Sequence, residues 1–171
     1  PCLVRNLVSL YGSQCVIGSI DFKKVKGQFK AFIKNGSEEI PILLKDYFKK
    51  VMDLGVGEIY LNSIDKDGTG QGFVIEILDF VDQARNPVIL AGGAGNSKHF
   101  LEAILHKNVS AVATANLFNF IGNGLPNARC ELKKQNIFLH LLLYHKYRFM
   151  VKKKDISPLK KGCDFNLFRI H

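Results

Sequence analysis

Short apolar runs alternate along the chain with segments in which apolar residues recur every three or four positions. The runs begin near residues 15, 57, 87 and 109, and each ends in polar residues or glycines. Such runs predict buried strands, and the helical spacing between them predicts helices. Strands that are apolar at nearly every position are typical of parallel sheets covered on both faces. The pattern therefore predicts an initial helix followed by four βα units.

The first unit contains an additional feature. Residues 23–32 alternate between lysine and apolar positions, which predicts a small hairpin turning at Lys26-Gly27, with a second turn at Asn35-Gly36. Helices are predicted over residues 3–10, 43–52 and 73–84, after residue 95, and in short form from Leu117.

Two architectures suit alternating strands and helices, a doubly wound dinucleotide-binding sheet and a (βα)8 barrel. The first expects GxGxxG after a strand, but residues 92–95 read GGAG, which lacks that spacing. In barrels a phosphate commonly binds between the last two βα loops, beside a short extra helix. Residues 92–95 and the ATAN of 113–116 suit those two loops. The predicted fold class is α/β, half of a (βα)8 TIM barrel with four parallel βα units and a hairpin after the first strand.

The net charge of +9 is unevenly distributed. Residues 1–128 carry 13 Lys/Arg and 12 Asp/Glu, whereas residues 129–171 carry 11 and 3. A nucleic-acid-binding domain is expected to present cations on its folded body, often with aromatic platforms. We therefore expect neither nucleic acid nor a membrane as a partner. The chain divides into a half-barrel of residues 1–136 and a basic tail of unknown structure, residues 137–171.

Four cysteines, Cys2, Cys15, Cys130 and Cys163, show neither CxxC spacing nor Cys/His ligand spacing. Scattered cysteines of this kind are typical of reduced thiols in the cytosol. No apolar run reaches the roughly 18 residues of a membrane span, and the first residues show no signal-peptide pattern. We expect a cytoplasmic location.

Carboxylates follow the first two predicted strands. Asp21 ends the first strand, where a carboxylate can act as a general acid or base, or can close a turn or cap a helix. Asp65 and Asp67 follow the second strand, and their spacing suits a solvated turn. A metal site would need further clustered ligands, which the sequence does not show. We expect no metal and no cofactor.

Glycines follow the second and third strands. A glycine such as Gly68 lets backbone N–H groups approach a phosphate. Gly92 and Gly93 precede a helix, and helix N-termini bind phosphate readily, although a tight βα turn also accounts for them. His99 and His106 on that helix are expected at the surface rather than as ligands or bases.

Three segments, after a strand ending at Asp21, resemble the C-terminal half of the cyclase subunit of imidazole glycerol phosphate synthase: GEIYLNSIDKDGTGQG, PVILAGGAGNSKHFLEA and AVATANLFNF. The resemblance covers about residues 1–136. It implies a barrel that forms a heterodimer with a glutaminase subunit. Ammonia from the glutaminase would react with a phosphorylated, nucleotide-like substrate. The products would be imidazole glycerol phosphate and an aminoimidazole carboxamide ribotide, in a lyase reaction of histidine biosynthesis.

The resemblance also implies roles for individual residues. Asp21 matches one of the two catalytic aspartates of the family. Asn62 and Ala91 lie beside the expected substrate, where the family usually has hydroxyl side chains. Val74 stands where the family often has an Asp that opens a helix. The positions that match the substrate's phosphate contacts are Asp67, Gly68, Gly92, Gly93, Ala115 and Asn116.

The strand that carries the family's other catalytic aspartate has no counterpart in the 171 residues. We therefore expect a truncated chain, inactive or nearly so by itself, which pairs with a missing N-terminal half-barrel or self-associates through its open edges. One alternative is a related group in surface-polysaccharide gene clusters, which shares these motifs and uses glutaminase-derived ammonia to amidate a sugar for lipopolysaccharide O-antigen. A non-catalytic half-barrel module is the other.

Overall fold

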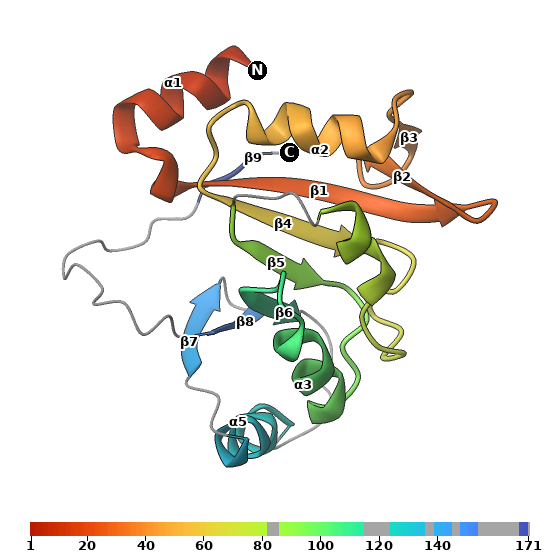
Figure 1. The fold of residues 1–171 in the computed structure, drawn as a ribbon, viewed down its shortest axis with the longest axis vertical. Helices are drawn as coiled ribbons and strands as arrows, with labels where there is room; N and C mark the ends of the chain where they lie inside the picture. The colour runs from red at the N-terminus through yellow and green to blue at the C-terminus, as the bar shows by residue number, and fades with distance from the viewer. Residues whose placement is uncertain (82–85, 115–123, 136–138, 145–147, 154–167, 171) are drawn as a thin grey trace.

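Four parallel strands in sequential order form the centre of the molecule (Figure 1). The computed structural model describes residues 1–81, 86–114, 124–135, 139–144, 148–153 and 168–170. The predicted half-barrel arrangement is confirmed, and no pairing among the described strands closes the sheet. The four strands are β1 (Val16–Val25), β4 (Glu58–Ser63), β5 (Val88–Ala91) and β6 (Ala111–Thr114).

Helices lie beside these strands, as the apolar spacing predicts. In α2 the buried residues Leu44, Phe48 and Val51 are four and three positions apart, so they form one stripe facing the sheet. The α3 helix buries Phe100, Ala103 and Ile104 in the same way. Apart from the helix between β4 and β5, the described helices are α1 (Cys2–Tyr11), the 3-10 helix η1 (Ser13–Cys15), α2 (Leu44–Met52), α3 (Ser97–Leu105) and α5 (Gly124–Lys134).

Between β4 and β5 the helix predicted over residues 73–84 is wrong in type and length. The structure has a 3-10 helix, η2 (Ile75–Phe80), and residues 82–85 lie outside the described part. Val74 stands at the N-cap and makes no side-chain cap hydrogen bond, whereas an Asp, Ser or Thr there would bond a first-turn N–H. The short helix predicted from Leu117 also begins outside the described residues.

The hairpin in the first unit is confirmed. β1 pairs antiparallel with β2 (Gln28–Ile33) around Lys26-Gly27, whose φ angles are 49° and 81°, as a two-residue hairpin turn requires. β2 then pairs with β3 (Glu38–Glu39) across the loop that contains Asn35-Gly36. One boundary differs, because β1 continues to Val25 instead of ending at Asp21. Its parallel pairing with β4 nevertheless ends at Phe22, so Asp21 remains near the carboxyl end of the parallel sheet.

The sheet is covered on both faces, as its apolar strands predict. One face belongs to the main core with the helices and buries Ile20, Leu61, Leu90 and Val112. The opposite face carries a smaller buried cluster of Ile89, Ala91, Ala111 and Ala113, with Ile17 and Tyr60 packed against it. The alternation along each strand therefore separates a helix-facing layer from an inner face, which in a barrel would point to its interior.

The tail contributes strands that the sequence pattern does not predict. β7 (Leu139–Tyr144) and β8 (Arg148–Lys153) pair antiparallel, and β8 pairs antiparallel with β6. β9 (Phe168–Ile170) pairs parallel with the first three residues of β1. The strand order is β3-β2-β1-β4-β5-β6-β8-β7, with β9 beside β1.

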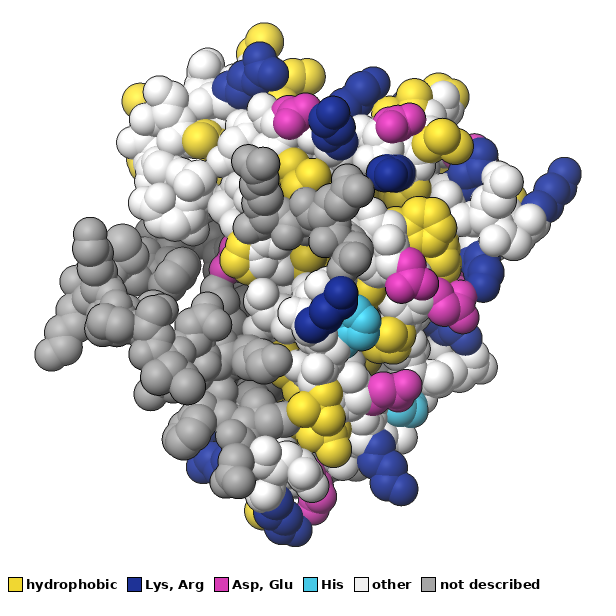
Figure 2. Space-filling view, in the orientation of Figure 1, with side chains coloured by type: hydrophobic (Ala, Val, Ile, Leu, Met, Phe, Trp, Pro, Cys, Tyr) yellow, Lys and Arg dark blue, Asp and Glu magenta, His cyan; other side chains and the backbone are white. Residues whose placement is uncertain are grey.

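One face of the molecule carries dispersed charge. On the face in Figure 2, Lys and Arg side chains are scattered among acidic and apolar ones and do not gather in one patch. Nucleic-acid surfaces typically concentrate their cations, so this face does not have that footprint. Among the described helices, none has the length and apolar content needed to cross a bilayer.

Candidate active site at the carboxyl ends of the strands

A row of side-chain positions crosses the four central strands near their carboxyl ends. Asp21 on β1 is the register partner of Asn62 on β4, Asn62 is the partner of Ala91 on β5, and Ala91 is the partner of Ala113 on β6. Register partners in a parallel sheet point to the same face, which here is the inner face defined by Ala91 and Ala113. Parallel βα folds build their active sites at this end of the sheet.

The two polar members of this row are bonded to each other. The Asn62 Nδ2 amide donates to Asp21 Oδ1 at 3.0 Å, and both residues are partly buried. A carboxylate that accepts from a neutral amide is held in one orientation. Asn62, which stands where the family usually has a hydroxyl residue, therefore positions the predicted catalytic carboxylate from the next strand.

Asp21 also lines a cavity of about 630 Å³ along the outer edge of β1, between α1 and α2. Tyr47 on α2 lines the same cavity, and burial together with the Asp21 charge raises the pKa of its phenol. The Ser19 hydroxyl, also in the lining, has no hydrogen-bond partner among the described residues. Arg5 and Lys50 add positive charge to the rim. Tyr47 is not among the predicted site residues. In the sequence it lies among the apolar residues of α2, and this pattern predicts a core position and not a contact with the site.

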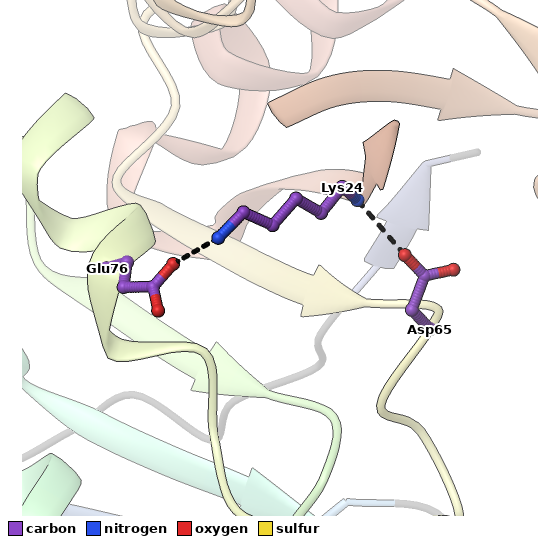
Figure 3. Close-up of polar contacts among 3 residues, drawn as sticks. All are labelled: Lys24, Asp65 and Glu76. Atoms are coloured by element: carbon purple, nitrogen blue, oxygen red, sulfur yellow. Dashed lines mark hydrogen bonds and ion pairs between the residues drawn. The ribbon is translucent and has the colours of Figure 1, made fainter. Parts of the chain in front are cut away.

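The two acids after β4 have different surroundings. Asp65 Oδ2 accepts the backbone N–H of Lys24 at 3.0 Å, and Lys24 Nζ forms an ion pair with Glu76 at 2.7 Å (Figure 3). Lys24 thus connects the hairpin to the β4 loop and to η2. Asp67 is exposed, and its backbone N–H donates to the Ser63 carbonyl oxygen. Both acids are exposed, and the Asp65 carboxylate differs in that it accepts a backbone N–H of the hairpin.

We expect Asp65→Ala to lower the free energy of unfolding by about 1 kcal/mol, because the Lys24 N–H loses its protein acceptor. Glu76→Gln is the matched control. Its ion pair with Lys24 is solvent-exposed, so the change should lie within about 0.5 kcal/mol. Urea unfolding followed by circular dichroism measures both values. Equal losses in the two variants would contradict the structural role of Asp65.

The glycine loop after β5 packs directly on the loop after β4. The Gly72 N–H donates to the Gly93 carbonyl oxygen at 2.7 Å. Gly92 and Gly93 are buried with φ angles of 87° and 103°, and a Cβ on Gly93 would lie 2.1 Å from the Gly72 carbonyl oxygen. Only glycine allows this approach. The structure therefore brings together the loops that contain Gly68, Gly92 and Gly93.

His99 helps to hold this loop, a role that sequence reasoning did not predict. Its Nδ1 accepts the Gly95 N–H at 3.0 Å, and its own backbone N–H donates to the Asn96 side chain at 3.1 Å. Asn96 is the N-cap of α3, and an Asn three residues before a partner N–H is a recognisable capping spacing. The His99 side chain is partly exposed, so this loop contact is added to the expected surface position and does not contradict it.

The structure leaves part of the predicted site undescribed. Ala115 and Asn116, the expected phosphate contacts after β6, lie outside the described residues. Among the described residues, no three His, Cys, Asp or Glu side chains lie close enough together to hold a metal ion. Cys2, Cys15 and Cys130 are free thiols, and Cys163 lies outside the described part.

Comparisons with known proteins agree with this arrangement. Residues 1–122 match the family model described as "Histidine biosynthesis protein". A putative imidazole glycerol phosphate synthase subunit hisF2 from Parasynechococcus marenigrum (strain WH8102) is 42% identical over 137 residues, which cover 80% of this chain and 51% of that protein. Imidazole glycerol phosphate synthase subunits HisF from Thermotoga sp. (strain RQ2) and Flavobacterium psychrophilum are 38% and 37% identical, each over 82% of this chain and 56% and 57% of their own length.

These matches confirm the resemblance predicted from the motifs, at the level of the family. The chain spans about half the length of the curated relatives it matches. The matched residues contain β1, β4, β5 and β6 and the loops that follow β1, β4 and β5, which together build the candidate site. The chain therefore belongs to the histidine biosynthesis protein family.

Proposed function

We propose that this chain supplies the C-terminal half of a cyclase barrel of the imidazole glycerol phosphate synthase type. The observation that carries the proposal is the inner-face row in which Asn62 orients Asp21, beside the packed loops of Gly68 and Gly92-Gly93. A positioned carboxylate next to glycine-rich loops suits acid–base chemistry on a phosphorylated substrate. Relatives of which the matched segment covers about half bear the name of that synthase.

The glycine loops hold one phosphate of the substrate. The N–H groups of Gly95 and His99 already donate within the loop, so we assign the phosphate to the backbone of Gly92, Gly93 and Gly68 instead of to the first turn of α3. Ala115 and Asn116 complete the contact from the next unit. Asp67, the exposed acid of the β4 loop, lies beside this site and binds substrate hydroxyl or N–H groups through its carboxylate.

Asp21 transfers protons while ammonia adds to the substrate and the new ring closes. A carboxylate serves as an acid or as a base at any given step, so closing a ring and cleaving a bond needs a second group on the opposite side. Asp67 lies on the neighbouring unit, on the same side as Asp21. The second group therefore comes from another half-barrel, and ammonia comes from a glutaminase subunit.

The test is an ammonia-dependent cyclase assay with an ammonium salt as the nitrogen source, which removes the need for the glutaminase. We expect the 171-residue chain to be at least about 10²-fold slower than an intact barrel, because one of its two proton-transfer groups is absent. Adding the first half of the Thermotoga relative as a separate polypeptide should restore turnover. Turnover by the chain alone at the rate of an intact barrel would refute the proposal. No turnover in either case, with both halves folded, would favour the sugar-amidating alternative.

A further inference from the structure

The tail strands pair with both edges of the four-stranded parallel sheet. β8 pairs with all four residues of β6, from Ala111 to Thr114. At the other side β9 pairs with Val16, Ile17 and Gly18 of β1, which lie within the part of β1 that β2 leaves uncovered. Each backbone N–H and C=O group at the edge of a sheet bonds to one neighbouring strand. A strand of another half-barrel would need these same groups.

The directions of the two pairings differ in a way that matters for a barrel. All eight strands of a (βα)8 barrel are parallel. β9 runs parallel to β1 and so occupies that edge as a barrel strand would. β8 runs antiparallel to β6, and β7 continues the antiparallel pairing. At the β6 edge the sheet therefore ends in a hairpin that no closed parallel barrel can contain.

We propose that residues 139–144, 148–153 and 168–170 form an edge strap, a built-in occupant of both sheet edges that must leave before another βα unit can pair there. The strap and a complementary half-barrel are then mutually exclusive partners of the same backbone groups. While the strap is bound, neither parallel edge is available to a second copy of the chain. Displacement of the strap would therefore have to precede the self-association expected for an open half sheet.

Hydrogen exchange in the full-length chain tests the strap without any assay of function. Val151, the register partner of Val112, and Arg169, the register partner of Ile17, are the positions to change. A proline removes a strand N–H and breaks the local pairing. The amides of residues 111–114 that point toward β8 are called outward-facing here. We expect Val151→Pro to speed their hydrogen exchange by about tenfold or more, without changing the exchange of the amides of residues 16–18. Arg169→Pro should have the reverse effect.

Val151→Ala and Arg169→Ala, which keep the strand N–H, are the controls and should change neither edge. The amides of residues 59–61 on β4 report whether the core stays folded. In the wild-type chain alone, outward-facing amides of residues 111–114 that exchange as fast as those of the Lys26-Gly27 turn would overturn the proposal. Unchanged edge exchange in both proline variants would also overturn it.

A binding measurement tests whether the strap and another half-barrel compete for the sheet edges. This experiment rests on the proposed function, because the competitor is another half-barrel. The probe is the first half of the Thermotoga relative. We expect the Val151→Pro/Arg169→Pro double variant to bind it about tenfold more tightly or better than the wild-type chain, since no strap has to be displaced. Equal affinity would overturn the competition. Binding is measured without turnover. The difference in affinity therefore still tests the strap even if the cyclase assay shows no activity.

Discussion

Asp21→Asn is expected to lower ammonia-dependent turnover of the completed barrel by about 10²–10⁴-fold, the usual cost of removing a positioned acid or base. The fold should not change, because an amide at position 21 still offers Asn62 an oxygen to donate to. Substrate affinity should change much less than the rate, since the phosphate contacts lie in other loops. Steady-state kinetics with the first half of the Thermotoga relative in saturating amounts measures both quantities.

Asp79→Asn is the matched control, since Asp79 is an exposed carboxylate on η2, away from the inner face. It should turn over at the wild-type rate. A rate loss below about threefold in Asp21→Asn would mean that this carboxylate does not transfer the proton in the slow step. A parallel loss of thermal stability would mean that it acts through the structure instead.

Gly93→Ala is expected to cost about 3 kcal/mol or more of folding free energy. Two causes add together. The φ of 103° is a backbone conformation that alanine rarely adopts, and the new Cβ would lie 2.1 Å from the Gly72 carbonyl oxygen. That oxygen is backbone and cannot rotate away, so the two loops must separate. Urea unfolding and the melting temperature measure the loss.

Gly27→Ala separates the two causes. Gly27 has a φ of 81°, but a Cβ there would meet nothing within 4 Å. Gly27→Ala should therefore cost only the free energy of placing alanine at a positive φ, about 1–2 kcal/mol. If the Gly93 and Gly27 variants lost equal stability, the close packing of the two glycine loops would be contradicted.

The fold of the body could be predicted from the sequence because its signals are local. The β1–β2 hairpin follows from the Lys26-Gly27 turn, and the parallel strands follow from short runs that are apolar at nearly every position. The η2 segment could not be predicted as a 3-10 helix, because its apolar spacing is helical and only the missing cap at Val74 indicates a weak start. The tail strands depend on pairing with β6 and β1, a long-range contact that apolar spacing does not encode.

The candidate site could be predicted only in part, because some of its features are local in the sequence and others depend on long-range contacts. Asp21 and the glycines are visible as residues that end strands, so their common edge follows from the parallel topology. The roles of Asn62, Tyr47 and His99 depend on the register between strands and on the side chains across a loop. Those relations exist only in the folded chain, so spacing alone does not predict them.

We propose that the loops after β4 and β5 form one phosphate site beside Asp21. Titration of the ¹⁵N-labelled full-length chain with imidazole glycerol phosphate tests it most directly, with amide chemical shifts as the readout. We expect saturable shifts at Gly68, Gly92 and Gly93, and none at Gly27 and Gly55, which lie in other turns. Shifts confined to residues 129–171, or saturable shifts that leave Gly92 and Gly93 unmoved, would contradict it.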